Sequence, residues 1–202
     1  MKLYYHPHSG YSQKVLIALH EKRAIFTPVI TKPSDSEFAK VTPLRKVPVL
    51  VLDNDWKIPE STIIIEYIDT HVSSGPRLIP EDRDQARQTR FHDRLADLYV
   101  HDSIGQLYFV PEDKRTADGV AAAHARLDTL FAGYEEHLAK RQWIMGDAFT
   151  MADCALIPPL GFARIVHPFD RWKHLSAYYT RALERPAVQK VLEESRPYMK
   201  SA

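Results

Sequence analysis

The chain has 202 residues, of which 45% are hydrophobic and 26% charged, and its formal net charge is +1. This length predicts one or two domains with a sizeable core. The balanced charge argues against nucleic acid or an acidic membrane surface as a partner. A single cysteine, Cys154, excludes an intramolecular disulfide framework and fits a reducing compartment. No apolar run approaches the ~20 residues of a membrane span, and the N-terminus lacks a signal-peptide core, so we expect a soluble cytoplasmic protein.

Residues 1 to about 75 are expected to form a mixed α/β domain. Runs of β-branched and aromatic residues predict strands at 2–5, 25–31, 47–52 and 56–58. Apolar residues at helical spacing predict helices that begin at Tyr11 or Ser12 and at Ser61, and 33–40 is a candidate short helix. The order βαβαββα resembles the thioredoxin-like fold. Since the Cys-x-x-Cys pair of that fold is absent, we do not expect dithiol redox chemistry.

The β pattern disappears after this first part of the chain. We expect helices at 81–109 (interrupted near Gly105 or at Pro111), 116–140, 151–166, 172–183 and 187–194. Leu95, Leu98 and Tyr99 are expected on the apolar face of the first. The prediction is therefore α/β plus all-α, with a thioredoxin-like domain over 1–75, a linker over 76–84 and an all-helical domain over 85–202.

The segment 45–61 carries features of a small-peptide site. Pro48 cannot donate to a sheet ladder and belongs at an edge or a strand start. If the Val47–Pro48 bond is cis, the Val47 amide and carbonyl are free to pair with an extended peptide. Ser61 is a candidate N-cap, and a helix start suits a carboxylate. Glu60 beside it could pair with an ammonium group.

These residues resemble the glutathione site of the glutathione S-transferase family. In that family the valine backbone at the Val47 position pairs with the cysteine of glutathione, and the following proline, here Pro48, is cis. The Glu60–Ser61 pair is implied to bind the γ-glutamyl end, and Lys46 to contact the glycine carboxylate. Each of these residues also has a purely structural alternative. Val47–Pro48 could be an ordinary Val-Pro in a strand, Ser61 an N-cap serine and Lys46 a solvated surface lysine.

A second resemblance lies at 146–153, whose sequence is Gly-Asp-Ala-Phe-Thr-Met-Ala-Asp. Thr150 and Asp153 have the spacing of a capping box, with Asp in place of the usual Glu or Gln. This resembles the buried cap that starts the central C-terminal helix of glutathione transferases. Its implied role is in folding, so we do not assign Asp153 to catalysis. The later run 185–191 is also similar to the family.

A transferase of this family must hold glutathione as a thiolate, and any hydroxyl near the first strand end or first helix start could stabilise it. Ser9 is the first candidate, because the run Ser9 to Val15 is similar to the serine-class pattern Ser-Pro-Tyr-x-x-Lys-Val, with Gly10 in place of proline. Tyr5 is the second candidate and Ser12 the third. Tyr5 has the alternative of a core residue. His6 and His8 are the unusual feature of this loop. His8 could stabilise the thiolate or touch the co-substrate, and the alternative for such a histidine is a solvated loop residue.

The resemblance places the electrophilic second substrate between the domains. Its implied contacts are Tyr11, Tyr99, His101 and Tyr108, although helical spacing does not show which face points inward. Ten histidines invite a metal hypothesis, but no HxxxH-type pair with a carboxylate occurs, so we expect no metal.

The leading hypothesis is an enzyme in which the glutathione thiolate, with glutathione as co-substrate, attacks a hydrophobic electrophile. The reaction could be conjugation, isomerisation, peroxide reduction or dehalogenation. The alternatives are a non-catalytic transferase-like binding or dimerisation module and a carrier of apolar ligands. Retention of Glu60 and Ser61 argues against the module. The family also implies a homodimer, with neither nucleic acid nor membrane as a partner.

Overall fold

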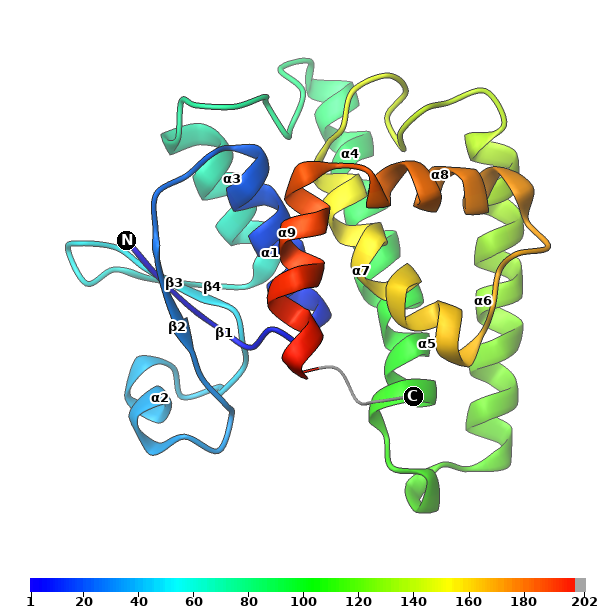
Figure 1. Cartoon of the computed structure of the whole chain (residues 1–202), viewed down its shortest axis with the longest axis horizontal. Coiled ribbons are helices and arrows are strands. Elements are labelled where there is room, and N and C mark those ends of the chain that lie inside the picture. Colours follow the sequence, from blue (N-terminus) through cyan, green and yellow to red (C-terminus); the bar gives the residue numbers. More distant parts are fainter. Residues whose placement is uncertain (199–202) are drawn as a thin grey trace. The chain divides into compact units, whose positions relative to one another are not determined.

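The computed structural model describes residues 1–198, and contacts within it divide the chain into two units (Figure 1). One unit is Met1–Leu78 together with the described residues from Arg185 to Tyr198, and the other is Ile79–Glu184. The described residues after Glu184 therefore group with the N-terminal unit. The sequence pattern alone had grouped them with the other helices, because helical periodicity does not specify which unit a helix packs against.

The N-terminal unit is built on a four-stranded sheet with the order β2-β1-β3-β4. Its strands are β1 (Lys2–Tyr5), β2 (Thr27–Ile30), β3 (Val49–Val51) and β4 (Lys57–Pro59). β2 runs parallel to β1, whereas β3 is antiparallel to both β1 and β4. With the helices in chain order the arrangement is βαβαββα, which confirms the predicted thioredoxin-like fold.

The helices of this unit are α1 (Gly10–Glu21), α2 (Ser36–Val41), α3 (Ser61–His71) and α9 (Pro186–Ser195), followed by a 3₁₀ turn, η4 (Arg196–Tyr198). α1 packs against both α3 and α9 and is buried over most of its length. The predicted start of the first helix at Tyr11 or Ser12 was wrong, because α1 begins at Gly10 with Ser9 as its N-cap. α3 begins at Ser61 as predicted, but the N-cap position expected for Ser61 is taken by Glu60.

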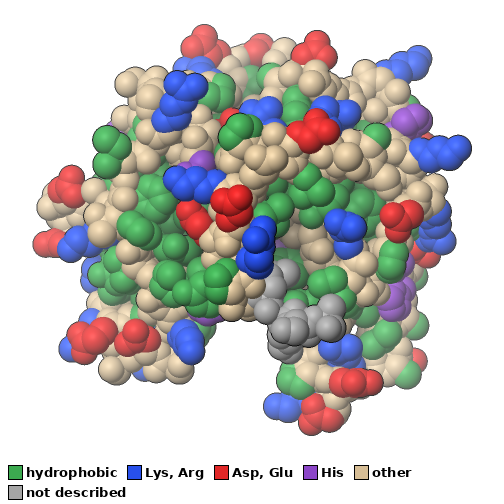
Figure 2. Space-filling view, in the orientation of Figure 1, with side chains coloured by type: hydrophobic (Ala, Val, Ile, Leu, Met, Phe, Trp, Pro, Cys, Tyr) green, Lys and Arg blue, Asp and Glu red, His purple; other side chains and the backbone are tan. Residues whose placement is uncertain are grey.

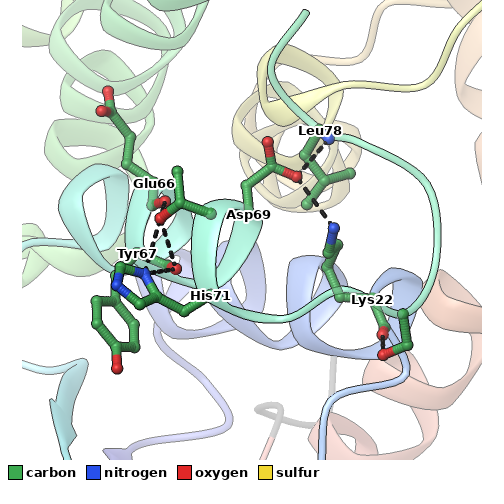
Figure 3. Close-up of polar contacts among 8 residues, drawn as sticks. Lys22, Glu66, Tyr67, Asp69, His71 and Leu78 are labelled. Atoms are coloured by element: carbon green, nitrogen blue, oxygen red, sulfur yellow. Dashed lines mark hydrogen bonds and ion pairs between the residues drawn. The ribbon is translucent and has the colours of Figure 1, made fainter. Parts of the chain in front are cut away.

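The segment after α3 is tied to α1 by buried polar contacts (Figure 3). Oδ1 of Asp69 lies 3.3 Å from the Lys22 ammonium and accepts the Leu78 amide at 2.7 Å. The Ser74 hydroxyl donates to the Lys22 carbonyl at 2.6 Å. Gly75 has φ +73°, and a Cβ there would lie 2.3 Å from the Glu21 carbonyl oxygen, so only glycine fits without a shift of backbone.

The second unit is helical. It contains α4 (Arg83–Leu95), η1 (Ala96–His101), α5 (Asp102–Ile104), η2 (Gly105–Phe109), η3 (Glu112–Lys114), α6 (Ala117–Leu138), α7 (Met151–Val166) and α8 (Lys173–Leu183). The helix predicted at 81–109 is present from Arg83 to Phe109 as one helical path, in which η1 and η2 have wide π-type turns. Its buried face carries Ala96, Val100 and Ile104. The expectation for Leu98 and Tyr99 was wrong, because these side chains are 55% and 48% exposed.

The core of this unit surrounds α7, which is buried along most of its length. The capping box of Thr150 and Asp153 is present at its start. Asp153 accepts hydrogen bonds from the amides of Thr150 at 2.8 Å and Ile144 at 2.9 Å, and from the Tyr178 hydroxyl at 3.1 Å. This carboxylate therefore joins the loop before α7 to α7 and α8.

The surface drawn in Figure 2 has Lys and Arg side chains interspersed with Asp and Glu. This mixture agrees with the formal net charge of +1. Every helix among residues 1–198 is too short or too polar to cross a lipid bilayer.

Candidate functional site

The sheet topology brings the segments singled out in the sequence to one edge of the N-terminal unit. β3 runs opposite to β1, β2 and β4, so the start of β3 lies beside the ends of the other three. Tyr4 pairs with Val49, and Val49 pairs with Pro59. The loop after β1, the Val47–Pro48 dipeptide before β3 and the Glu60–Ser61 start of α3 therefore meet at the same edge.

The loop between β1 and α1 is held in place by its own hydrogen bonds. The Ser9 amide donates to the His6 carbonyl at 2.9 Å, and the Ser9 carbonyl accepts the Gln13 amide at 2.9 Å. The half-buried Ser9 side chain caps α1 by accepting the Ser12 amide at 3.4 Å. The Ser9 hydroxyl donates its proton to no described group, so it can donate a hydrogen bond to a ligand at the positive end of the 12-residue helix α1.

The other hydroxyl candidates in this region are less suited to meet a bound thiol. Ser12 is fully buried, and its Oγ accepts the His6 amide at 3.3 Å. Tyr5 is 4% exposed, and burial, followed by the charges of Glu194 and Tyr198, raises its pKa. Tyr4 stacks on Phe38 with ring centroids 6.1 Å apart. Tyr11, beside Ser9 in the chain, is half-buried.

The dipeptide Val47–Pro48 precedes β3 directly, and its peptide bond is cis. Pro48 is buried and Val47 half-buried. Within residues 1–198, the Val47 amide and carbonyl form no backbone hydrogen bond. A strand end with an unpaired donor and acceptor can accept an extended peptide as an added strand.

The start of α3 has a second set of unused polar groups. The Ser61 hydroxyl forms no hydrogen bond within residues 1–198, although this residue is only 6% exposed. The first N–H groups of an 11-residue helix lie beside it, which suits a carboxylate. Glu60 has φ +69°, and strained residues of this kind cluster at functional sites. Its exposed carboxylate could meet an ammonium group.

The basic side chains near this edge differ in exposure, because Arg45 and Lys46 are exposed whereas Lys14 is buried. Lys46 immediately precedes Val47, and Arg45 before it has φ +50°. The Lys14 ammonium, 1% exposed, donates to the Thr62 hydroxyl in the first turn of α3 at 3.0 Å. The edge thus has both exposed cationic side chains, on Arg45 and Lys46, and the start of α3.

His6 and His8 interact with one another in the loop. Nδ1 of His6 accepts the His8 amide at 3.2 Å, so the proton of a neutral His6 ring lies on Nε2. Burial, followed by the charge of Lys32, lowers the pKa of His6. His6 is therefore a neutral donor at physiological pH, with the Tyr198 ring edge-on at 5.6 Å.

The residues predicted to contact a second substrate in the helical unit point in different directions. Tyr99 is 48% exposed, whereas His101 is buried with 8% exposed. Two helical residues at this spacing project to nearly opposite sides, so they do not share a surface. Tyr108 is half-buried, with its ring 5.0 Å from that of Phe162. Thr150 and Asp153 lie in the buried cap of α7.

Two further residues contact the loop that carries Ser9 and were missed in the sequence. The Gln13 side chain and the Ser195 hydroxyl both donate to the Pro7 carbonyl. Ser195 is 188 residues away from Pro7, so no local pattern could have indicated it. Within the described residues, His, Cys, Asp and Glu side chains form no group of three or more that could hold a metal ion.

Known proteins resemble both parts of the chain. Residues 3–76 match the family model of the glutathione S-transferase N-terminal domain, and residues 117–181 match that of the C-terminal domain. Glutathione S-transferase F6 of Arabidopsis thaliana is 31% identical, and the match covers 95% of this chain and 99% of that protein.

Solved structures show the same likeness. BphK, described as a bacterial GST in a ternary complex, has a TM-score of 0.88 at 26% identity, over 97% of this chain and 100% of that one. A glutathione S-transferase from Methylobacillus flagellatus, solved with GSH bound, has a TM-score of 0.85 at 26% identity, over 94% and 98% of the two chains.

Proposed function

Because the chain belongs to the glutathione S-transferase family, we propose that it uses the thiolate of bound glutathione to attack a hydrophobic electrophile. The observation that carries the proposal is the set of unused polar groups at one edge of the sheet, at Ser9, Val47 and Ser61. Glutathione is a small extended peptide with a thiol, a free amine and two carboxylates. Each of these groups has a counterpart at this edge.

Ser9 is proposed to activate the thiol by donating its hydroxyl proton to the sulfur. A hydrogen bond to a charged group is worth roughly 1.5–3 kcal/mol, and one pKa unit corresponds to about 1.4 kcal/mol. Such a bond would lower the thiol pKa from about 8.5 by about one to two. The start of α1 acts in the same direction, because Ser9 is its N-cap.

The remaining contacts would hold the peptide in register with Ser9. The Val47 amide and carbonyl pair with the backbone of the cysteine residue, as in strand addition. The γ-glutamyl carboxylate is received by Ser61 and the first amides of α3, and its ammonium by Glu60. Lys46 is the candidate for the glycine carboxylate.

In the proposed reaction the thiolate sulfur forms a bond to an electrophilic carbon of the second substrate. In a substitution, the leaving group departs with the electron pair of its bond to that carbon. In an addition, the π electron pair of the attacked double bond moves into the conjugated acceptor, which then takes a proton from water. Tyr11, next to Ser9 and Gly10, is the nearest candidate for contact with this substrate. Roles for Tyr99, His101 and Tyr108 remain predictions from the resemblance.

The decisive experiment is calorimetric titration with glutathione for the wild type, Ser61→Ala and the matched control Ser73→Ala. Ser73 is an exposed serine just after α3. We expect binding by the wild type and the control, and binding at least tenfold weaker for Ser61→Ala, which loses its hydrogen bond to a charged group. No binding at millimolar glutathione would favour the non-catalytic module instead.

The thiol-activating residue is tested by the ultraviolet absorbance of the bound thiolate against pH. Ser9→Gly keeps much of the capping preference of position 9 and removes the hydroxyl. It is expected to raise the bound-thiol pKa by about one to two, and Ser9→Thr to keep it low. Tyr5→Phe and Ser12→Ala are the comparisons. A rise with Tyr5→Phe alone would transfer the role to Tyr5.

A cytoplasmic location and a homodimer complete the proposal, as the family resemblance implies. Light scattering after size-exclusion chromatography tests the dimer directly. A mass near the 23.2 kDa of one chain would contradict it.

A further inference from the structure

The Pro7 carbonyl is the acceptor of two side-chain hydrogen bonds from different helices. Nε2 of Gln13 in α1 and Oγ of Ser195 at the end of α9 both lie 2.9 Å from it. Gln13 is 5% exposed and Ser195 1% exposed, and Pro7 is buried. A buried carbonyl without a ladder partner requires such donors.

The two donors also contact each other, which closes a small network. Nε2 of Gln13 lies 3.3 Å from Oγ of Ser195, so its two hydrogens can serve Pro7 and Ser195 together. The single Ser195 proton has two acceptors within reach, the Pro7 carbonyl and the Val191 carbonyl at 2.7 Å. The Pro7 carbonyl therefore keeps its hydrogen bond from Gln13 even when the Ser195 hydroxyl donates to Val191 instead.

Gln13 contacts the loop at both of its ends. Its side chain holds Pro7, and its amide donates to the Ser9 carbonyl at 2.9 Å. The Ser9 amide in turn donates to the His6 carbonyl. A displacement of Pro7 would therefore be passed on to the backbone that orients the Ser9 hydroxyl.

α9 is anchored along α1, so Ser195 is held in place. At its start, Arg185 forms a two-pronged ion pair with Glu21, at 2.8 and 2.7 Å. Val188 and Val191 are each 1% exposed, and α9 packs on α1. Beyond its end, Tyr198 meets the His6 ring. These contacts hold α9, and with it Ser195, against α1.

We infer that Gln13 and Ser195 are positioning residues that set the Ser9 hydroxyl, and that α9 thereby takes part in thiol activation. This inference rests on the proposed function for its consequence in catalysis. The contacts themselves, all within one unit, do not depend on it.

The test uses Ser195→Ala and Gln13→Met, which remove the donors at similar volume. Ser176→Ala is the matched control, since its hydroxyl also donates to a backbone carbonyl, that of Phe169 at 3.1 Å, in the helical unit. The first readouts are the pKa of the bound glutathione thiol and the separate values of kcat and KM for glutathione.

We expect both variants to raise the pKa of the bound thiol by about 0.5 to 1 pKa unit, because the Ser9 donor is misplaced. For the same reason, kcat is expected to fall about three- to tenfold. KM for glutathione is expected to stay within about twofold, because Val47, Glu60 and Ser61 are untouched. The inference is overturned if neither variant moves the thiol pKa while Ser9→Gly does. In that case the proposed function stands.

A second readout needs no glutathione. Hydrogen exchange of the Ser9 and Gln13 amides, both bonded within the loop, is expected to be about fivefold faster in Ser195→Ala and Gln13→Met, as for loss of one hydrogen bond. Ser176→Ala is expected to match the wild type. Unchanged exchange in both variants would overturn the inference even if the wild type bound no glutathione.

Discussion

The Lys22 ammonium lies 3.3 Å from Oδ1 of Asp69, and the two side chains are 2% and 1% exposed. This pair joins the end of α1 to α3, and the same carboxylate oxygen receives the Leu78 amide (Figure 3). A buried charge is costly unless its partner is in place. The pair therefore fixes the path of the chain as it leaves the thioredoxin-like unit.

Removing one member of this pair should be strongly destabilising. Lys22→Met leaves the Asp69 carboxylate buried without its ammonium partner, and we expect the free energy of unfolding in urea to fall by about 3–5 kcal/mol. The control is Lys40→Met, which removes the exposed ion pair with Glu37. That change should stay within about 0.5 kcal/mol. A loss below about 1 kcal/mol for Lys22→Met, the size typical of an exposed ion pair, would contradict the role given to this buried pair.

Two glycines should respond to alanine in opposite directions. Gly75→Ala adds a Cβ 2.3 Å from the Glu21 carbonyl oxygen at φ +73°, so we expect a loss of about 2–4 kcal/mol. Gly133 lies inside α6, and a Cβ there meets nothing within 4 Å. Gly133→Ala should therefore gain about 0.5–1 kcal/mol. Thermal unfolding measures both, and equal effects would contradict the close approach at Gly75.

The Asp153 carboxylate should make stability depend on pH in an unusual direction. Burial raises its pKa from 3.8 to about 6, although the hydrogen bonds from Ile144, Thr150 and Tyr178 act the other way. Between these values the folded state binds more protons than the unfolded state. Stability attributable to this group is therefore lost as pH rises from about 4 to about 6, by about 3 kcal/mol.

Asp153→Asn should abolish this slope in urea unfolding between about pH 4 and pH 8. At neutral pH the variant is expected to be less stable by about 2–3 kcal/mol, because one amide oxygen cannot accept all the hydrogen bonds. Asp147→Asn, in the exposed loop before α7, is the control. If both variants keep the wild-type slope, Asp153 is ionised throughout this range.

His92 is expected to destabilise the folded state, and this destabilisation should increase at acid pH. Its Nδ1 is buried without a partner among the described residues. Burial, followed by the charges of His137 and Arg141, lowers its pKa to about 4. Since the unfolded chain takes up the proton near pH 6.5, stability from this group is present above that pH and is lost below it. The loss is about 2 kcal/mol at pH 5.

His92→Leu should therefore be more stable than the wild type, by about 1 kcal/mol at pH 7.5 and about 3 kcal/mol at pH 5. Urea unfolding at the two pH values measures the difference. Phe91→Leu, an exposed neighbour on α4, controls for the added leucine and should keep the wild-type pH dependence. Parallel pH dependence in wild type and His92→Leu would refute the role of His92.

Local patterns were sufficient for most of the secondary structure and for the family. The predicted 2–5 strand and 151–166 helix have the observed bounds, and the helix predicted to begin at Ser61 does so. These features depend on side-chain periodicity and on residues that start or end helices and strands, which are local properties of the sequence. The start of α1 lies one or two residues before the predicted one, and the N-cap of α3 is Glu60 and not Ser61. The resemblance drawn from Val47–Pro48, Glu60–Ser61 and the 146–153 run is confirmed by the matching domains.

Assembly of the candidate site depended on contacts between distant residues. By itself, the sequence determined which chemical groups are present: the Ser9 hydroxyl, a proline that cannot join a ladder, and a serine at a helix start. Only the tertiary structure decided that Leu98 and Tyr99 face solvent, that Ser12 is buried, and that Ser195 reaches Pro7. These outcomes depend on which faces pack together, because burial and long-range hydrogen bonds are set by the whole fold and not by neighbours in the chain.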